Sequence, residues 1–283
     1  MAAVFFFASR DGINQIGFTI MAAVYMFVPL LSVIIVKKFH REPVFGNLLI
    51  SFKVNRWFFV SWLIFPVIVF CSVGISVLLP GLSYNPQMTG FLGRVENLIP
   101  PEASEEFSNR INSLPINFLL LSVIQGLFAG ITVNAIAGFG EEIGWRGFLF
   151  KEFKDMHFLK AALVIGSVWG IWHAPLILMG HNYPQHTQIG VLMMTVYCIL
   201  LTPLLQYLTI KSRSVISAAI AHGTHNAVFG ISIIATSGGN DLTSGMTGIP
   251  GFITLLIFNL LLFIYDCFVS KEKILLSKIS AYI

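Results

Sequence analysis

Long apolar runs alternate with short polar segments along most of the chain, and this alternation sets the expected architecture. In order, the runs cover about 17–36, 57–79, 116–137 continuing to 150, 160–180, 187–209, 214–236 and 249–269. A helix of about 20 apolar residues is long enough to cross a bilayer. The pattern therefore predicts an all-α, polytopic transmembrane helical bundle of about 7–8 spans, the eighth arising if one run is broken or the N-terminus inserts.

Composition favours a membrane protein over a soluble one. Hydrophobic residues make up 56% of the chain and charged residues 11%, and the mean hydropathy is +0.82. Soluble domains carry about 25% charged residues, so half of the usual surface charge is missing. No polar segment is long enough to act as a linker, which predicts a single integral-membrane domain over 1–283 with a motif-bearing core at about 116–236.

Lysines and arginines are unevenly distributed among the connecting segments. The segments rich in them are 37–56, 151–160, 210–213 and 270–283. Positive charge is retained on the cytoplasmic side of a membrane, so these segments and the C-terminus are predicted to face the cytoplasm. The same distribution accounts for the net charge of +4 without a nucleic-acid partner.

Three of the predicted spans contain polar or ionisable side chains. The stretch GFGEEIGWRG at 138–147 places two glutamates and an arginine in the third span. The full set is Glu141, Glu142, Arg146, His173, His222 and Asn226. An ionisable group inside a membrane helix costs about 2.5–3.5 kcal/mol on insertion scales, so each is a functional candidate.

These groups lie at similar depths when they are counted from the basic segments. At about 1.5 Å per residue, the two glutamates lie roughly 14 Å deep, His173 roughly 20 Å, and His222 and Asn226 roughly 13–20 Å. Groups at one depth on three helices can meet. The sequence therefore predicts a polar catalytic cavity open to the cytoplasm.

Helical spacing gives the charged residues of the third span different environments. Glu142 and Arg146 are four residues apart, in the orientation that favours an ion pair. This pair either holds the bundle together or orients a catalytic group. Glu141 is rotated by about 100° from it and can face another helix. A carboxylate in a low-dielectric site is suited to general-base chemistry near neutral pH, so Glu141 is the predicted base.

The two later spans supply candidate partners for that base. His222 and Asn226 are four residues apart and can offer hydrogen bonds to one point, as an oxyanion requires. His173 follows Trp169 by four residues, and Pro175 is expected to kink this span and open it to water.

Three further polar residues have less defined roles. His225 lies on the same arc as His222, which leaves a site role open. Asn134 is expected to pack between helices. His181 flanks a turn that contains Pro184 and is expected at the surface.

A glutamate with two histidines permits two hydrolytic mechanisms. A divalent metal such as zinc, held by Glu141, His173 and His222, would lower the pKa of a bound water. In the metal-free alternative, the glutamate and a histidine activate water directly. None of the seven histidines is followed by Glu, which excludes the H-E-x-x-H pattern of zinc intramembrane proteases.

At these positions the sequence resembles the CAAX protease and bacteriocin-processing (CPBP) family of intramembrane proteases, which includes the type II CAAX prenyl endopeptidases. The family pattern is E-E-x-x-x-R, then F-x-x-x-H, then H-x-x-x-N. The chain matches it in order at 141–146, 169–173 and 222–226, with Trp169 where the family has Phe. One such motif is weak, but three in order at one depth are specific.

The resemblance implies hydrolysis of a peptide bond near the cytoplasmic interface, in a lipidated (prenylated) or membrane-associated substrate surrounded by membrane lipid. In prenyl-processing members the last three residues of a CaaX protein are removed. By this resemblance Glu141 and His173 would activate water. His222 with Asn226 would form the oxyanion site, and Glu142 with Arg146 would orient the base, with Trp169 supporting the site beside them. Only two histidines are matched, which favours metal-free catalysis without a cofactor.

Two other functions remain open. Ion-coupled membrane transporters also use buried Glu, His and Arg side chains, although the chain shows no internal repeat and its polar groups do not follow a path. A non-catalytic family member acting in bacteriocin immunity is the third reading, and the intact motifs argue against it.

Overall fold

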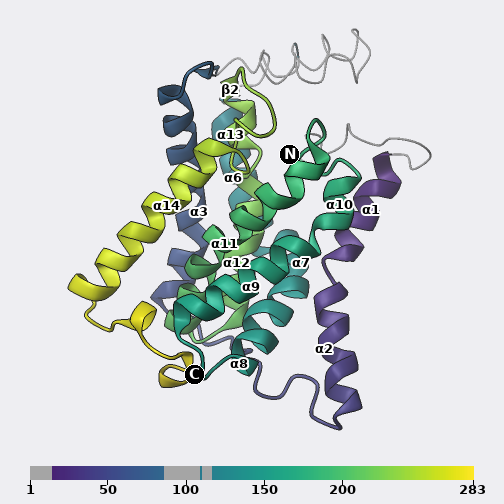
Figure 1. Ribbon diagram of the computed structural model, residues 1–283, viewed down its shortest axis with the longest axis vertical. Coiled ribbons are helices and arrows are strands. Elements are labelled where there is room, and N and C mark those ends of the chain that lie inside the picture. Colours follow the sequence, from purple (N-terminus) through teal and green to yellow (C-terminus); the bar gives the residue numbers. More distant parts are fainter. Residues whose placement is uncertain (1–14, 86–108, 110–116) are drawn as a thin grey trace.

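The computed structural model describes residues 15–85, 109 and 117–283, which form a helical bundle with a short two-stranded sheet (Figure 1). The N-terminal helices are α1 (Gln15–Tyr25), α2 (Val28–Phe39) and α3 (Arg56–Leu78). The motif region contains α6 (Phe118–Ile131), α7 (Val133–Glu142), the π-helix η2 (Ile143–Leu149), α8 (Phe150–Glu152), α9 (Phe158–Trp172), α10 (Ala174–Leu178), α11 (Thr187–Ser212) and α12 (Val215–Val228). The chain continues through α13 (Ile231–Ile234), α14 (Ile249–Ile264), the π-helix η3 (Tyr265–Val269) and the 3₁₀ helices η4 (Ile274–Leu276) and η5 (Ile279–Ala281).

Helix α12 lies at the centre of the bundle. It packs against α3, α6, α7 and α11, while α9 packs against α11 and α14 against α3. Small buried residues such as Ala218, Ala221 and Gly223 occupy much of α12. Small side chains allow membrane helices to approach closely, so α12 can bring its polar residues within reach of several neighbours. In Figure 1, α1 and α2 lie on one side of this centre, and α3 and α14 on the other.

Among the described residues, four helices are long and apolar enough to cross a membrane. They are Ile20–Phe39, Arg56–Leu78, Thr187–Ser212 and Ile249–Val269. The helices Phe118–Ile131 and Val133–Glu152 follow each other with a bend of 51° between them. Counted together as one broken span, they give a fifth. Many large apolar side chains on these helices are exposed, as contact with lipid requires. These features confirm the predicted all-α, polytopic membrane bundle.

The segments predicted as spans at 160–180 and 214–236 form shorter helices. The first breaks at His173, between α9 and α10, because Pro175 cannot continue the hydrogen-bonding pattern of α9. The expected kink is thereby confirmed. The second, α12, is 14 residues long and ends at Val228. The total of about 7–8 spans stays a prediction.

The third predicted span is also irregular. Its halves, α6 and α7, meet at Thr132, and α7 then continues into η2. A π-helical turn inside a helix often lies at a functional site. No feature of the sequence had predicted one here.

The segments rich in Lys and Arg are joined at one end of the bundle, where the C-terminus lies in Figure 1. The contacts that join them are Asn55–Ser212, Lys154–Ser280 and Lys211–Glu272. The hydrogen bond from the Lys37 ammonium to Glu42 at this end holds the pKa of that carboxyl below its usual range. We refer to this end as the basic end.

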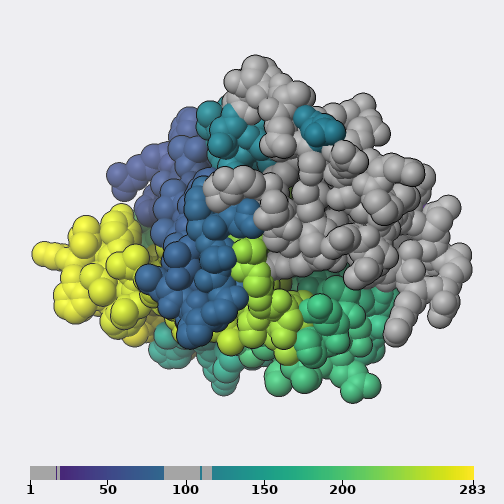
Figure 2. Space-filling view, turned by 90° about the horizontal axis from the view of Figure 1, so that it is seen from above, coloured from purple at the N-terminus to yellow at the C-terminus, as the bar shows by residue number. Residues whose placement is uncertain are grey.

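The opposite end carries the small sheet. Strand β1 (Ser83–Tyr84) pairs antiparallel with β2 (Thr236–Ser237), with Ser83 opposite Ser237. Figure 2 views this end from above and shows residues 236–248 in yellow-green between α3 in blue and the green residues that follow α10. The segment after α10 and residues 236–248 contribute His181, Asn182 and Thr247 to the lining of the site described next.

Candidate active site

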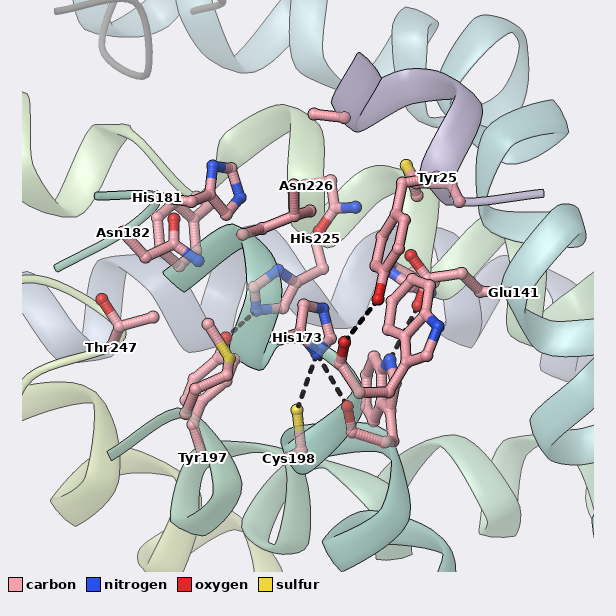
Figure 3. A pocket seen from close by; sticks show the side chains of 18 of the residues that line it. Tyr25, Glu141, His173, His181, Asn182, Tyr197, Cys198, His225, Asn226 and Thr247 are labelled. Carbon is pink, nitrogen blue, oxygen red and sulfur yellow. Dashed lines mark hydrogen bonds between the residues drawn. The ribbon is translucent and has the colours of Figure 1, made fainter. Parts of the chain in front are cut away.

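A cavity of about 320 Å³ lies between α1, α7, α9, α11 and α12 (Figure 3). The four residues predicted to be catalytic line this cavity together with Trp169. They are Glu141, His173, His222 and Asn226. The structure thus brings together three motifs that are separated by up to 85 positions in the chain (141 to 226).

Glu141 is the second-last residue of α7 and is held by two indole groups. Its Oε2 atom accepts a hydrogen bond of 2.7 Å from Trp169 Nε1 and a longer one of 3.4 Å from Trp145 Nε1. The side chain is buried, with an exposed fraction of 2%. Both bonds end on Oε2, and the residue lines the cavity.

Glu142 has a different set of partners. Its Oε1 atom accepts from Arg146 Nη1 at 3.0 Å and from His222 Nδ1 at 2.8 Å. Arg146 Nη2 donates to Thr202 Oγ1 at 3.1 Å, and the guanidinium lies 4.5 Å from the centre of the Trp169 ring. Glu142 and Arg146 are fully buried, which confirms the predicted ion pair and places it behind the cavity wall.

Hydrogen bonds fix the orientation of both motif histidines. His173 Nδ1 lies 2.8 Å from the carbonyl oxygen of Trp169. A carbonyl can only accept, so Nδ1 carries the proton and Nε2 is an acceptor in the neutral ring. In His222, Nδ1 likewise donates to the Glu142 carboxylate, which leaves Nε2 as its second functional atom.

Several lining residues were not predicted from the sequence. Tyr25 of α1 forms part of the wall, stacks on Trp172 at 4.3 Å and donates to the Trp172 carbonyl oxygen at 2.8 Å. Tyr197 and Cys198 contribute from α11. These residues lie in apolar runs, where an isolated Tyr or Cys resembles ordinary packing.

The structure also places Asn134, His225 and His181, whose roles the sequence left less defined. Asn134 donates to the Gly223 carbonyl oxygen at 3.3 Å, as expected for an amide that joins two helices. His225 lines the cavity and is bonded to Tyr197. The expectation that His181 lies at the surface is wrong, because the turn after α10 folds back and brings it into the cavity lining.

The motif residues do not fit a metal site in this arrangement. Among the residues that the structure describes, no group of three or more His, Cys, Asp or Glu side chains is placed to hold a metal ion. Both histidines hydrogen-bond through Nδ1, as metal-bound histidines also do, so the spacing of the side chains is what disfavours a metal here.

The described part of the cavity extends away from the basic end. Helix α12 starts near Arg213, and the lining there runs from His222 to Phe229, the residue after the helix. Along α9 and α10 it runs from Trp169 through Leu176, and it ends at His181 in the following turn. Glu141 therefore lies at the side of the cavity nearer the basic end. The predicted opening of the cavity to the cytoplasm stays a prediction.

Comparison with known proteins identifies the region that carries the motifs. Residues 115–228 match the family described as type II CAAX prenyl endopeptidase Rce1-like. Over 125 residues, 44% of the chain, the protein is also 27% identical to CAAX prenyl protease 2 of Methanococcus maripaludis. The match covers 35% of that relative, so the two share about a third of its length. The matched region contains all three motifs, which meet at one cavity, so this part of the chain is similar to the type II CAAX prenyl endopeptidases of the Rce1-like family.

Proposed function

We propose that the protein is an intramembrane endopeptidase that removes the C-terminal tripeptide of prenylated CaaX-type proteins or of an analogous membrane-associated peptide. The observation that carries this proposal is the buried Glu141 carboxylate, held by Trp169 at 2.7 Å in a cavity that His173, His222 and Asn226 also line. A positioned carboxylate next to imidazole and amide groups is the composition that hydrolysis of an amide requires.

Glu141 acts as the general base. Its second carboxylate oxygen and the Nε2 acceptor of His173 both suit a water molecule bound in the cavity. In this arrangement Glu141 takes a proton from the water, whose oxygen then attacks the carbonyl carbon of the scissile bond. A base in hydrogen-bond reach of water contributes roughly 10²–10⁴-fold to such a reaction.

His222 and Asn226 stabilise the oxyanion that forms. His222 Nδ1 already donates to Glu142, so Nε2 can donate to the substrate only when the ring carries a second proton. Two carboxylates and one guanidinium leave one negative charge in this buried cluster. Protonation of His222 cancels that charge, which is favourable where water is excluded.

The reaction ends with transfer of the proton that Glu141 accepted. As the carbon–nitrogen bond of the tetrahedral intermediate breaks, this proton moves to the departing amine nitrogen. The products are a new C-terminal carboxylate on the lipidated protein and a free tripeptide. Glu142 and Arg146 keep His222 oriented throughout, and the steps need no metal or cofactor.

The first span suits the cavity to a lipidated substrate. Ala22, Ala23, Tyr25 and Met26 line the cavity from α1 and the residue after it, while Ile20 and Val24 are 59% and 61% exposed on the outer surface. In the part of the chain that the structure describes, α1 therefore lies between this side of the cavity and the outer surface. A prenyl chain gains about 0.8 kcal/mol per buried CH₂, so it can remain in the bilayer while the peptide enters the cavity.

The basic end faces the cytoplasm in this proposal, with the C-terminus on the same side. The scissile bond then lies near Glu141, roughly 14 Å from the cytoplasmic surface. A lipid-modified segment lying along the inner leaflet can reach this depth.

The proposal is tested with purified protein in proteoliposomes and a farnesylated CaaX peptide, with product release followed by mass spectrometry. The wild type is expected to release the tripeptide, Glu141→Gln to release none, and a zinc chelator to leave the rate unchanged. Cleavage by Glu141→Gln would refute the assigned base, and a chelated enzyme rescued by zinc would refute the metal-free mechanism. Ion-coupled uptake without hydrolysis of any peptide would favour the transporter instead.

A further inference from the structure

We propose that the wall of the cavity opposite Glu141 is a binding site for the free C-terminal carboxylate of the peptide segment that is released. Its residues are His181 and Asn182 from the turn after α10, and Tyr197 and His225 from α11 and α12. This inference rests on the proposed function and extends it, because it names the group by which the enzyme would recognise the end of its substrate.

The two polar sets lie on opposite sides of one cavity. Figure 3 shows Glu141 and Tyr25 on one side, His181, Asn182 and Tyr197 on the other, and His173 between them. All of these residues line the same space. A peptide bound across the cavity would therefore present its scissile bond to one set and its end to the other.

His225 supplies a buried donor that lacks a partner. The Tyr197 hydroxyl is bonded to His225 Nε2, and a phenol is the better donor of the two, so Nδ1 carries the ring proton. Within the described part of the chain, His225 Nδ1 has no hydrogen-bond partner, and the residue is only 2% exposed. A buried polar group without a partner is rare, and a ligand that supplies an acceptor would satisfy it.

The side chain of Asn182 is available in the same way. Among the described residues, its buried Oδ1 atom has no hydrogen-bond partner. The oxygen and nitrogen of an asparagine amide can exchange places by rotation, so the side chain can present either acceptor or donor to a ligand. Its backbone has φ = 61°, a left-handed conformation that asparagine adopts more readily than most other residues with a Cβ atom.

The turn that carries His181 and Asn182 is held firmly in place. The buried Tyr183 hydroxyl donates to the Thr247 carbonyl oxygen at 2.7 Å, and burial raises the pKa of Tyr183 above its usual range. The backbone N–H of Gln185 donates to Asp241 at 2.7 Å, and His186 also bonds this carboxylate. A site fixed before the ligand arrives loses less entropy on binding.

The charge of this wall fits a single carboxylate better than a phosphate group. None of the described lining residues is Lys or Arg. Burial lowers the pKa of His181 to about 4, so its imidazole is uncharged near neutral pH. Neutral N–H donors can share a singly charged carboxylate, whereas a doubly charged group would call for cations.

The size of the cavity matches a short C-terminal segment. Along α12 its lining runs from His222 to Phe229, which is roughly 10 Å of helix at about 1.5 Å per residue. An extended peptide covers roughly 10 Å in three residues. With the scissile bond at His222, the carboxylate of a tripeptide would thus reach the opposite wall.

The test measures binding of two farnesylated peptides of one sequence, one with a free C-terminal carboxylate and one with a C-terminal amide. Both are titrated into the Glu141→Gln variant in nanodiscs, so that no turnover occurs. We expect the carboxylate peptide to bind about tenfold or more tightly, since hydrogen bonds to a charged group are the stronger ones. Asn182→Gly, which tolerates the left-handed backbone, and His181→Ala should each reduce this ratio toward one.

Gln188→Ala is the matched control, because Gln188 is exposed, lies six residues from Asn182 (182 to 188) and does not line the cavity. It should keep the full carboxylate preference. Equal affinity for the two peptides, or an unchanged ratio in Asn182→Gly with a wild-type melting temperature, would overturn the inference. Failure of the proposed function would give a different result. The carboxylate peptide would still bind more tightly than the amide peptide, but the wild-type protein would hydrolyse neither.

Discussion

The indole nitrogen of Trp169 on α9 lies 2.7 Å from the carboxylate oxygen Oε2 of Glu141 on α7. The resembled family has Phe at this position, and a phenyl ring has no donor. We expect Trp169→Phe to keep the aromatic wall but lose the hydrogen bond. A hydrogen bond to a charged group contributes about 1.5–3 kcal/mol, so kcat should fall by roughly 10- to 100-fold. Steady-state cleavage of a farnesylated CaaX peptide measures this change.

Trp145→Phe is the matched control for that substitution. It also removes an indole donor to Glu141, but one at the longer distance of 3.4 Å. Its effect on kcat should be smaller, with KM little changed in both variants. A Trp169→Phe enzyme with wild-type kcat would show that the bond does not position the base.

The buried ion pair between Glu142 and Arg146 provides a second prediction. Arg146→Gln removes the partner of a carboxylate that has no exposed surface, so the free energy of unfolding should fall by about 3–5 kcal/mol. Glu142→Gln should also destabilise, because it leaves a buried guanidinium uncompensated. Thermal unfolding in detergent would measure both losses.

The double variant distinguishes a pair from two independent contributions. Glu142→Gln/Arg146→Gln buries two neutral groups in place of two charges. Its loss of stability should therefore be clearly smaller than the sum of the single losses. Additive losses would mean that the two side chains do not stabilise each other.

The parts of the site that could be predicted are those governed by position along a helix. Side chains four residues apart meet on one face in any helix, so the Glu142–Arg146 pair followed from spacing alone. Insertion depth follows from the distance to a basic segment, which is why Glu141, His173 and His222 could be expected together. The break at His173 followed from the covalent geometry of Pro175.

The parts that were missed depend on tertiary contacts. An indole in an apolar run resembles packing, so Trp145 was not predicted, and Trp169 was predicted to support the site but not to donate to Glu141. The direction of a turn depends on the residues that it packs against. The turn with His181 is held by the hydrogen bond between Tyr183 and Thr247, which are 64 positions apart, so the local sequence does not indicate its direction. The π-helical turn at η2 has no known sequence signature here.

Close packing of α7 and η2 against α2 gives a third prediction. A Cβ atom added at Gly144 would lie 2.6 Å from Pro29 Cβ. Gly144→Ala should therefore force the two segments apart and lower the free energy of unfolding by about 1–3 kcal/mol. Gly74→Ala is the control, because a Cβ atom at Gly74 of α3 meets nothing within 4 Å.

Thermal unfolding of the two variants side by side measures the difference. Gly74→Ala should be neutral or slightly stabilising, since Ala has the higher helix propensity by about 1 kcal/mol. Equal melting temperatures for the two variants would contradict the tight approach of Pro29 to η2.

The position of the basic end relative to the membrane is the subject of the last prediction. The positive-inside rule places Lys278 in the cytoplasm. It places Gln188 outside, because Gln188 lies at the end of α11 opposite to Lys211. Cysteines are introduced singly at these two exposed positions, with Cys71 and Cys267 replaced by Ala and the buried Cys198 retained. A membrane-impermeant maleimide should label Gln188→Cys in intact cells, and Lys278→Cys only after the membrane is opened. The reverse result would show that the basic end lies outside. It would also turn the His181 side of the cavity toward the cytoplasm, so that a CaaX peptide could enter directly along the axis of the cavity and need not pass α1 from the lipid.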